Sequence, residues 1–204
     1  MATDGSGPAL LSLGSINVDV QFRIEHWPDA GDTVDVQRAT ESAHARGMSV
    51  VLDPAPPEHM EKRLYPLADI LTPNALEAQR LSGRAVASAE DAGAAAAVLR
   101  ERGTSAVVIK LQNGGCVVAT AQGWRHFTAV PVPVVDTTDA GDGFTGALAV
   151  ALLEGRRIDQ AALMGTAAAA IAVGGYGAQP SYPDRSRLDG MFQLLQEANA
   201  RSPG

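Results

Sequence analysis

The stretch that decides the fold runs from residue 136 to residue 144 and reads Asp136-Thr137-Thr138-Asp139-Ala140-Gly141-Asp142-Gly143-Phe144. An apolar run of β type, residues 130–135, precedes it, and a helical run, residues 145–153, follows it. A strand that turns through small residues into a helix presents unused backbone N–H groups and the positive end of the helix dipole at one point. Such a point suits a phosphate or an oxyanion. Asp142 lies inside the turn, where a carboxylate repels phosphate but can take a proton from a hydroxyl that attacks one.

The pattern Asp-Thr-Thr-x-Ala-Gly-Asp-x-Phe resembles the C-terminal signature of the ribokinase-like (PfkB) carbohydrate kinases. The resemblance implies that Asp142 is the catalytic base. It also implies that the amides of Ala140, Gly141 and Asp142 form an anion hole for the γ-phosphate of ATP, with Asp139 and Gly143 beside the phosphates. Asp139 departs from the family, which usually has Gly or Ala there, and it adds negative charge near the phosphates. On the residues alone, an ordinary capped helix start is the alternative.

Length and composition limit the class of protein. The chain has 204 residues, 46% of them hydrophobic and 19% charged, with a net charge of −7. This suits one globular domain, or one domain with a small appendage. No basic run is present, which argues against a nucleic-acid partner, and no apolar stretch is long enough for a membrane span.

The single cysteine, Cys116, excludes an internal disulfide and fits a reducing cytoplasm, where we expect the protein to act. We interpret Cys116 as a small buried residue of a strand rather than as a nucleophile. Residues 1–8 are polar and are interpreted as a disordered leader, not a signal peptide.

Strand patterns alternate with helix patterns along most of the chain. We expect strands at residues 9–14, 15–22, 33–37, 49–53, 68–73, 105–110, 115–120 and 124–130. We expect helices at residues 57–64, 74–82, 89–102, 139–154, 158–173 and 186–199, and the end of a further helix at 41–46. This order predicts an α/β fold with a mostly parallel sheet and helices on both faces. The resemblance implies the three-layer α/β/α arrangement of ribokinases.

The resemblance covers residues 9–38 and 48–190, with a gap between them. A Gly-Gly-x-x-x-Asn segment, a long helix and several further units of the family are absent. We infer an internal deletion near residues 38–47, of roughly a third of a usual family member. We therefore expect one ribokinase-like domain over residues 9–200. Residues 9–40 would keep the N-terminal strands and a lid remnant, and residues 48–200 the nucleotide-binding and catalytic part.

Asn74 and Glu77 stand three residues apart at the start of an expected helix. They resemble the family's Asn-x-x-Glu motif, which implies that Asn74 lies near the phosphates and that Glu77 binds Mg²⁺ through water. The residues alone also predict a capping box, with Asn74 as N-cap and Glu77 at N3. Both interpretations stay open at this point.

Two further segments resemble nucleotide-binding parts of the family. Residues 109–115 resemble a turn near the nucleotide, with Gly115 as the matched glycine and Lys110 able to neutralise phosphate charge. Gln112 replaces a glycine that the family has in this turn, so we expect either a reshaped turn or backbone angles that Gln can adopt. Thr166 stands where the family often has Asn or His near the adenine.

Other positions match the family's sites for a monovalent cation and for the sugar. Asp136, Thr138, Gly177 and Ser181 match positions around a K⁺ site. Asn17 and Asp19, after the first strand, match the residues that face the sugar hydroxyls. Asn and Asp suit a polyol because an amide and a carboxylate donate and accept several hydrogen bonds.

Two functions of different classes follow from these patterns. The first is an ATP-dependent sugar kinase of ribokinase type that uses Mg²⁺ and K⁺ and acts on a pentose or a similar small sugar, with monomer and homodimer both left open. The second is a catalytically impaired nucleotide-binding remnant, because the deletion removes the sugar clamp and most of the lid. We expect the nucleotide-binding half to be better preserved than the sugar-binding half.

Overall fold

The computed structural model of the chain describes residues 10–13 and 36–201. The strands of this part are β1 (Leu10–Leu13), β2 (Ser49–Leu52), β3 (Ile70–Leu71), β4 (Ala106–Lys110), β5 (Cys116–Thr120) and β6 (Gly123–Phe127). The α-helices are α1 (Val36–Ala45), α2 (Ala75–Ser82), α3 (Ala89–Glu101), α4 (Ala140–Leu153), α5 (Ile158–Ala172), α6 (Ala178–Ser181) and α7 (Arg185–Arg201). Two 3₁₀ helices, Pro57–His59 and Lys62–Leu67, lie between β2 and β3.

The strands form one sheet in the order β1-β2-β3-β4-β5-β6. β1 to β4 are parallel to one another, and the two hairpins β4–β5 and β5–β6 are antiparallel. Leu10 lies opposite Ser49 and Leu71 lies opposite Val107 in the parallel part. Parallel strands need crossover connections, and the segments between them supply α1, α2 and α3.

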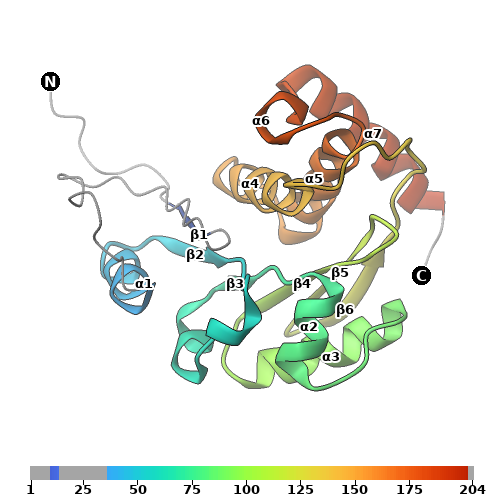
Figure 1. Cartoon of the computed structure of the whole chain (residues 1–204). Coiled ribbons are helices and arrows are strands. Elements are labelled where there is room, and N and C mark those ends of the chain that lie inside the picture. The colour runs from blue at the N-terminus through green and yellow to red at the C-terminus, as the bar shows by residue number, and fades with distance from the viewer. Residues whose placement is uncertain (1–9, 14–35, 202–204) are drawn as a thin grey trace, which may run out of the picture.

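Helices cover both faces of the sheet, as Figure 1 shows: α2 and α3 lie on one face, and α4, α5 and α7 on the other. Successive residues of a strand point to opposite faces, so the two cores take alternate residues. Val107 and Ile109 of β4 pack toward α2 and α3, whereas Val108 packs toward α4, α5 and α7. The predicted α/β fold with a mostly parallel sheet between two helix layers is confirmed.

Local signals set the ends of the helices. Asn74 caps α2 and Ser88 caps α3, each in a complete capping box with the residue at N3. α2 ends at Gly83, which adopts a left-handed conformation with φ of 75°, an angle that costs glycine little. These features explain why helices were predictable here to within one or two residues.

Proline changes the segment before α4. Residues 130–135 were predicted as a strand, but the structure has no strand there. Pro131 and Pro133 lack the N–H that a ladder needs. Val135 instead donates its N–H to Val173 O, at 2.7 Å, and so ties the segment to the end of α5.

Other predicted elements differ in type or extent. The strand expected at 33–37 is wrong at its end, because Val36 and Gln37 begin α1. In place of the helix expected at 57–64, the structure has the 3₁₀ helix Pro57–His59 and the start of the 3₁₀ helix Lys62–Leu67. β6 ends at Phe127 rather than at 130, and α6 was not predicted. The strand expected at 15–22 lies outside the described residues.

Candidate active site

Polar side chains meet where the parallel strands end. Asp53 directly follows β2, Asn74 follows β3, and Lys110 is the last residue of β4. Asn74 and Lys110 form an isolated bridge, and Lys110 N donates to Pro73 O at 2.9 Å. Ligands of α/β proteins bind at this edge of a sheet, so the strand ends bring together residues far apart in the sequence.

The start of α4 faces the same edge. Its N-cap, Asp139, has φ of 57° and ψ of 8° and makes no capping hydrogen bond through its side chain. Ala140 N lies 3.5 Å from Thr137 O, at the limit of a hydrogen bond, and the regular ladder begins with Gly143 N donating to Asp139 O at 2.9 Å. The amides of the first turn are therefore oriented along the helix axis, as an anion site requires.

An acidic cavity of about 200 Å³ opens beside this turn. It is lined by Asp53, Ala55, Asn74, Glu77, Lys110, Asp139, Gly141 and Asp142. Four of these residues carry carboxylates and one carries an ammonium group. The structure thus brings together the expected catalytic and magnesium residues, and adds Asp53 to them.

A larger cavity of about 710 Å³ adjoins the first. Asn74, Lys110 and Gly141 line both cavities. Apolar residues make much of the wall of the larger one, among them Leu76, Val130 and Ala170. A cavity of this size with a mostly apolar wall and a few polar groups at one end is typical of a small-molecule site.

Asn74 and Glu77 form the capping box that the sequence offered as the alternative to a magnesium motif. Asn74 Oδ1 accepts from Glu77 N at 2.9 Å, and Glu77 Oε2 accepts from Asn74 N at 2.7 Å. Burial raises the pKa of the Glu77 carboxyl, and the nearby carboxylate of Asp53 raises it further, against the bond from Asn74 and the charges of Lys110 and Arg80. Glu77 nevertheless lines the acidic cavity, so capping leaves it able to face a ligand.

Asp53 is the site residue that the sequence analysis did not assign. Its Oδ2 accepts from Lys110 Nζ at 2.6 Å and from Thr145 Oγ1 at 2.8 Å. Only 5% of the residue is exposed. The available signal was its place at the end of a buried strand, in Asp53-Pro54-Ala55-Pro56.

Asp136 joins two of the loops that were expected to surround a K⁺ site. Its Oδ1 accepts from Thr138 N at 2.9 Å, and its Oδ2 accepts from Gly177 N at 3.3 Å. The bonds from Thr138, and then that from Gly177, lower the pKa of the Asp136 carboxyl. The neighbouring Ser181 is buried, with 5% of the residue exposed.

The other residues that the sequence analysis assigned to the site lie in several different environments. Gly115 is buried, and its N donates to Asn113 Oδ1 at 3.3 Å. Gln112 does not have a positive φ, so its backbone angles are ones that Gln can adopt, and Gly114 has the positive φ of this turn, at 86°. Gly143 packs close to the Tyr182 ring, which a Cβ would approach to 3.3 Å. Asn17 and Asp19 lie outside the described residues.

Thr166, which was expected near the adenine, lies in α5, and its role at a nucleotide stays a prediction. It is fully buried, and its Oγ1 donates to Ala162 O at 2.9 Å and to Cys116 Sγ at 3.6 Å. Thr166 is not among the residues that line the larger cavity, whereas Ala169 and Ala170, three and four residues further along the same face of α5, are. Burial raises the pKa of the Cys116 thiol to about 12, which agrees with a packing role for this cysteine.

Comparison with known proteins places the chain in a family. The model of the pfkB family of carbohydrate kinases matches residues 20–185, and the chain belongs to this family. The chain is 41% identical over 163 residues to the ribokinase of Haemophilus influenzae, a match that covers 80% of this chain and 52% of that protein. It is 36% identical over 162 residues to the ribokinase of Staphylococcus aureus, covering 79% and 50%.

Solved structures of the family have the same fold. Thermotoga maritima ribokinase matches with a TM-score of 0.68 and 36% identity, over 76% of this chain and 52% of that one. Arabidopsis thaliana ribokinase complexed with ribose and ATP matches with a TM-score of 0.71 and 31% identity, over 76% and 51%. The chain spans about half the length of the relatives it matches. Within residues 10–13 and 36–201, no helix is long and apolar enough to cross a membrane.

Proposed function

We propose that the chain is an ATP-dependent sugar kinase of ribokinase type. The observation that carries this is the place of the α4 N-terminus, where the two cavities meet. Gly141 lines both cavities, and Asp142 lines the acidic one. The larger cavity would hold the nucleoside, with its phosphates directed to the amides of Ala140, Gly141 and Asp142.

The residues fit a divalent cation bound with the phosphates. Mg²⁺ prefers oxygen ligands and keeps several waters, and the acidic cavity offers the carboxylate of Glu77. No group of three His, Cys, Asp or Glu within the described ranges is placed to hold a metal by itself. Mg²⁺ would reach Glu77 through water and neutralise phosphate charge when ATP is bound. Asp136, Thr138, Gly177 and Ser181 would line the K⁺ site.

The chemistry would be an in-line displacement with Asp142 as base. The oxygen of a primary sugar hydroxyl bonds to the γ-phosphorus, and its proton passes to the Asp142 carboxylate. The bond between that phosphorus and the bridging oxygen breaks, and ADP leaves. The α4 N-terminus and Lys110 stabilise the charge on the transferred group. Asn17 and Asp19 would hold the sugar.

A second function is favoured by one observation, the length of the chain. Because it spans about half of its relatives, it can have kept the nucleotide site while lacking much of the sugar site. In that case ATP binds and no sugar is phosphorylated. The described domain, from β1 to α7, would then act only as a nucleotide-binding module.

One assay separates the two functions. ADP release is measured with and without ribose, in Mg²⁺ and K⁺, for the native chain and for Asp142→Asn, while calorimetry measures ATP binding. A kinase gives ribose-dependent release that falls by about 10²–10⁴-fold in the variant. ATP binding without ribose-dependent release excludes the active kinase, and robust release that the variant abolishes excludes the remnant.

A further inference from the structure

Asp53 connects three elements beneath the start of α4. From the end of β2, its Oδ2 accepts from Lys110 Nζ on β4 and from Thr145 Oγ1 on α4. Thr145 Oγ1 also lies 3.2 Å from Thr72 Oγ1, and Thr72 Oγ1 lies 3.4 Å from Leu52 O. One carboxylate oxygen therefore holds an ammonium group and a hydroxyl that come from segments 57 and 92 residues away in the sequence.

Lys110 is held next to the expected anion hole. A Cβ built on Gly141 would lie 3.4 Å from Lys110 Nζ, so the ammonium group stands against the backbone of the turn. Thr145 lies one turn further along the same helix. The carboxylate thus sets the position of the cation and of the helix end relative to each other.

The stability of the fold does not account for this carboxylate. Its other oxygen, Oδ1, is buried and has no hydrogen-bond partner among the described residues. A buried carboxylate that is only half satisfied is a costly feature, and an apolar residue would often be as stable. A buried polar atom without a partner calls for an explanation, and a role in a site is one.

We propose that Asp53 is a positioning residue, which holds Lys110 beside the α4 turn so that its ammonium group meets the terminal phosphates of the bound nucleotide. This rests on the proposed function, since the ligand is taken to be a nucleoside polyphosphate. Lysine is flexible and loses side-chain entropy when it binds an anion, so a lysine held in place beforehand binds the anion more tightly.

A positioning role for Asp53 and a purely electrostatic role predict opposite changes in ATP affinity when Asp53 is replaced. Asp53 is negative, so if it acted only through its charge, Asp53→Asn would tighten the binding of ATP. If Asp53 positions Lys110, the same variant weakens the binding of ATP and of ADP by about tenfold, which is the effect of losing one charge-assisted hydrogen bond. Adenosine has no phosphate, so its affinity stays within about twofold of that of the native chain.

Calorimetric titration with ATP, ADP and adenosine in Mg²⁺ tests this on the full chain. Asp159→Asn is the control, because it makes the same charge change at a residue that pairs with Arg125, at 2.7 Å, and lines neither cavity. It leaves all three affinities unchanged. Lys110→Met loses the phosphate-dependent affinity, and adding Asp53→Asn to it causes no further loss, because the aspartate acts through the lysine.

The outcomes are distinguishable. Adenosine binding reports whether each variant is folded, and Thr145→Val, which removes the other partner of Oδ2, repeats the test more mildly if Asp53→Asn does not fold. Unchanged or tighter ATP binding by a folded Asp53→Asn overturns the positioning role alone, as do additive losses in the double variant. A native chain that binds neither ATP nor adenosine overturns the proposed function and this role with it.

Discussion

At the scale of single residues, Asp139 is the feature that departs most from what a phosphate site needs. It is the one non-glycine with a positive φ in the described part of the chain, at 57°. The left-handed conformation costs roughly 1–2 kcal/mol for an ordinary residue, less for Asp. Its carboxylate also lines the acidic cavity, where it repels an incoming phosphate.

We expect Asp139→Gly to bind ATP about three- to tenfold more tightly and to melt at a higher temperature, since it removes both charge and strain. Calorimetry and thermal denaturation measure the two effects. Asp139→Asn separates them: it removes the charge but keeps a side chain at the same φ, so it gains affinity with little gain in stability. Weaker ATP binding by both variants would contradict this account and would mean that the carboxylate contributes to binding.

Gly115 is required for a different reason, a close approach of two backbones. A Cβ there would lie 2.4 Å from Phe127 O across the β5–β6 hairpin. Gly115→Ala should lower the free energy of unfolding by roughly 1–3 kcal/mol, as overpacking does. Gly146→Ala is the control, because a Cβ on this α4 residue meets nothing within 4 Å. It should be neutral or stabilising by about 0.5–1 kcal/mol. Urea denaturation measures both, and equal effects would refute the steric explanation.

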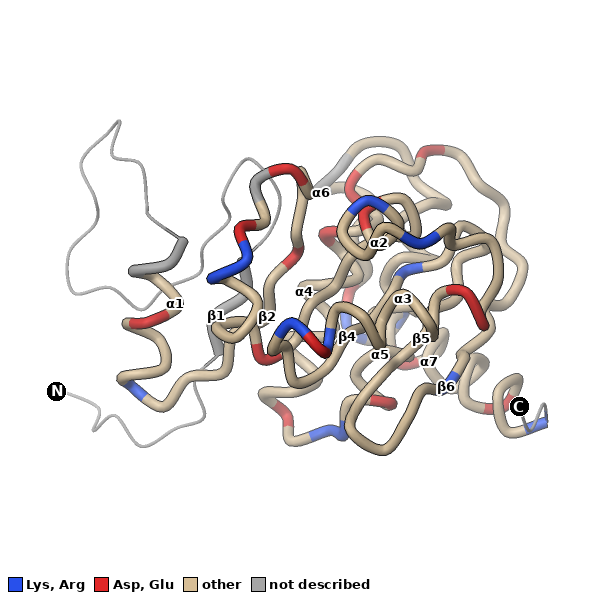
Figure 2. The backbone as a smooth tube through the Cα atoms, turned by 90° about the horizontal axis from the view of Figure 1, so that it is seen from below, with Lys and Arg blue, Asp and Glu red and all other residues tan. Residues whose placement is uncertain are grey.

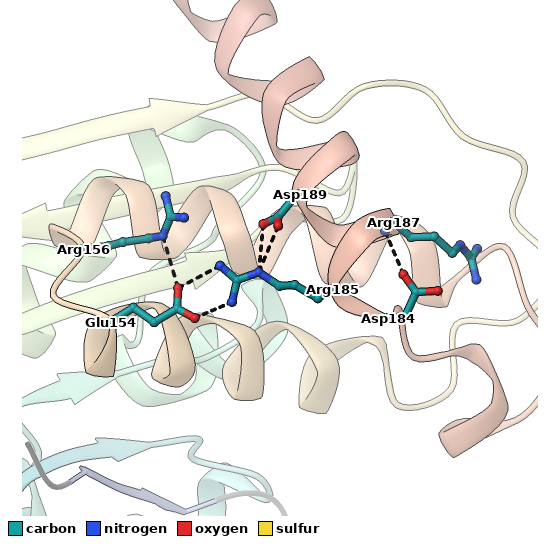
Figure 3. Close-up of polar contacts among 6 residues, drawn as sticks. All are labelled: Glu154, Arg156, Asp184, Arg185, Arg187 and Asp189. Carbon is teal, nitrogen blue, oxygen red and sulfur yellow. Dashed lines mark hydrogen bonds and ion pairs between the residues drawn. The ribbon is translucent and has the colours of Figure 1, made fainter.

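At the scale of elements, an ion-pair cluster fastens the start of α7 to the end of α4. Figure 3 shows the Arg185 guanidinium between the carboxylates of Glu154 and Asp189, with Arg156 on the far side of Glu154. Both Glu154 oxygens accept from Arg185, one of them at 3.1 Å. Hydrogen bonds from Arg185, and its charge, lower the pKa of the Glu154 carboxyl. The bonds to the carboxylates of Glu154 and Asp189, and their charges, raise the pKa of Arg185.

The cluster predicts a pH-dependent stability. A carboxyl with a lowered pKa stabilises the folded state above its ordinary pKa, and this stabilisation is lost as the pH falls through the lowered value. Arg185→Gln should therefore lower Tm by about 1–3 °C at neutral pH, the small effect of an exposed cluster, and the difference should vanish in acid or high salt.

Arg187→Gln is the matched control for this cluster. It makes the same charge change on the same helix, and in Figure 3 the Arg187 side chain points away from Glu154, while only its backbone N bonds Asp184, at 2.9 Å. It should leave Tm unchanged at every pH. A Tm difference for Arg185→Gln that persists below the pKa of Glu154 would show that the ion pair does not cause it.

At the scale of the whole molecule, charge is spread rather than gathered. Figure 2 shows acidic and basic positions interspersed along the described backbone, without a basic stretch. The net charge of the chain is −7. Affinity for a nucleotide must therefore come from local groups, such as the α4 N-terminus, Lys110 and a bound cation, rather than from an overall attraction.

The chain should be stabilised by nucleotide more than by sugar. Mg·ATP at a hundredfold excess over its Kd stabilises the folded state by about 2.7 kcal/mol, which raises Tm by about 5–10 °C. Ribose alone should shift Tm little if the internal deletion inferred near residues 38–47 removes much of the sugar site. Asp142→Asn should keep the ATP shift, since it removes the base and not the amides. A ribose shift as large as that of ATP would indicate a complete sugar site.

Predictions from the sequence were most accurate where interactions between residues close in the sequence determine the structure. The helices capped at Asn74 and Ser88 and the hairpin turn at Gly114 follow from capping and turn chemistry within a few residues. The segment 130–135 was misjudged because its apolar pattern suggested a strand, while two prolines and the carbonyl of Val173 decided its backbone.

By itself, the sequence determined the family, the α/β order of elements and the turn from Asp136 to Phe144 that starts α4, because these depend on short patterns along the chain. Only the tertiary structure decided that Asp53, Lys110 and Thr145 share one carboxylate oxygen, and that Gly141 stands between two cavities. Strand order and the packing of α4 on the sheet bring those residues together, and no spacing in the sequence encodes a contact across 57 or 92 residues.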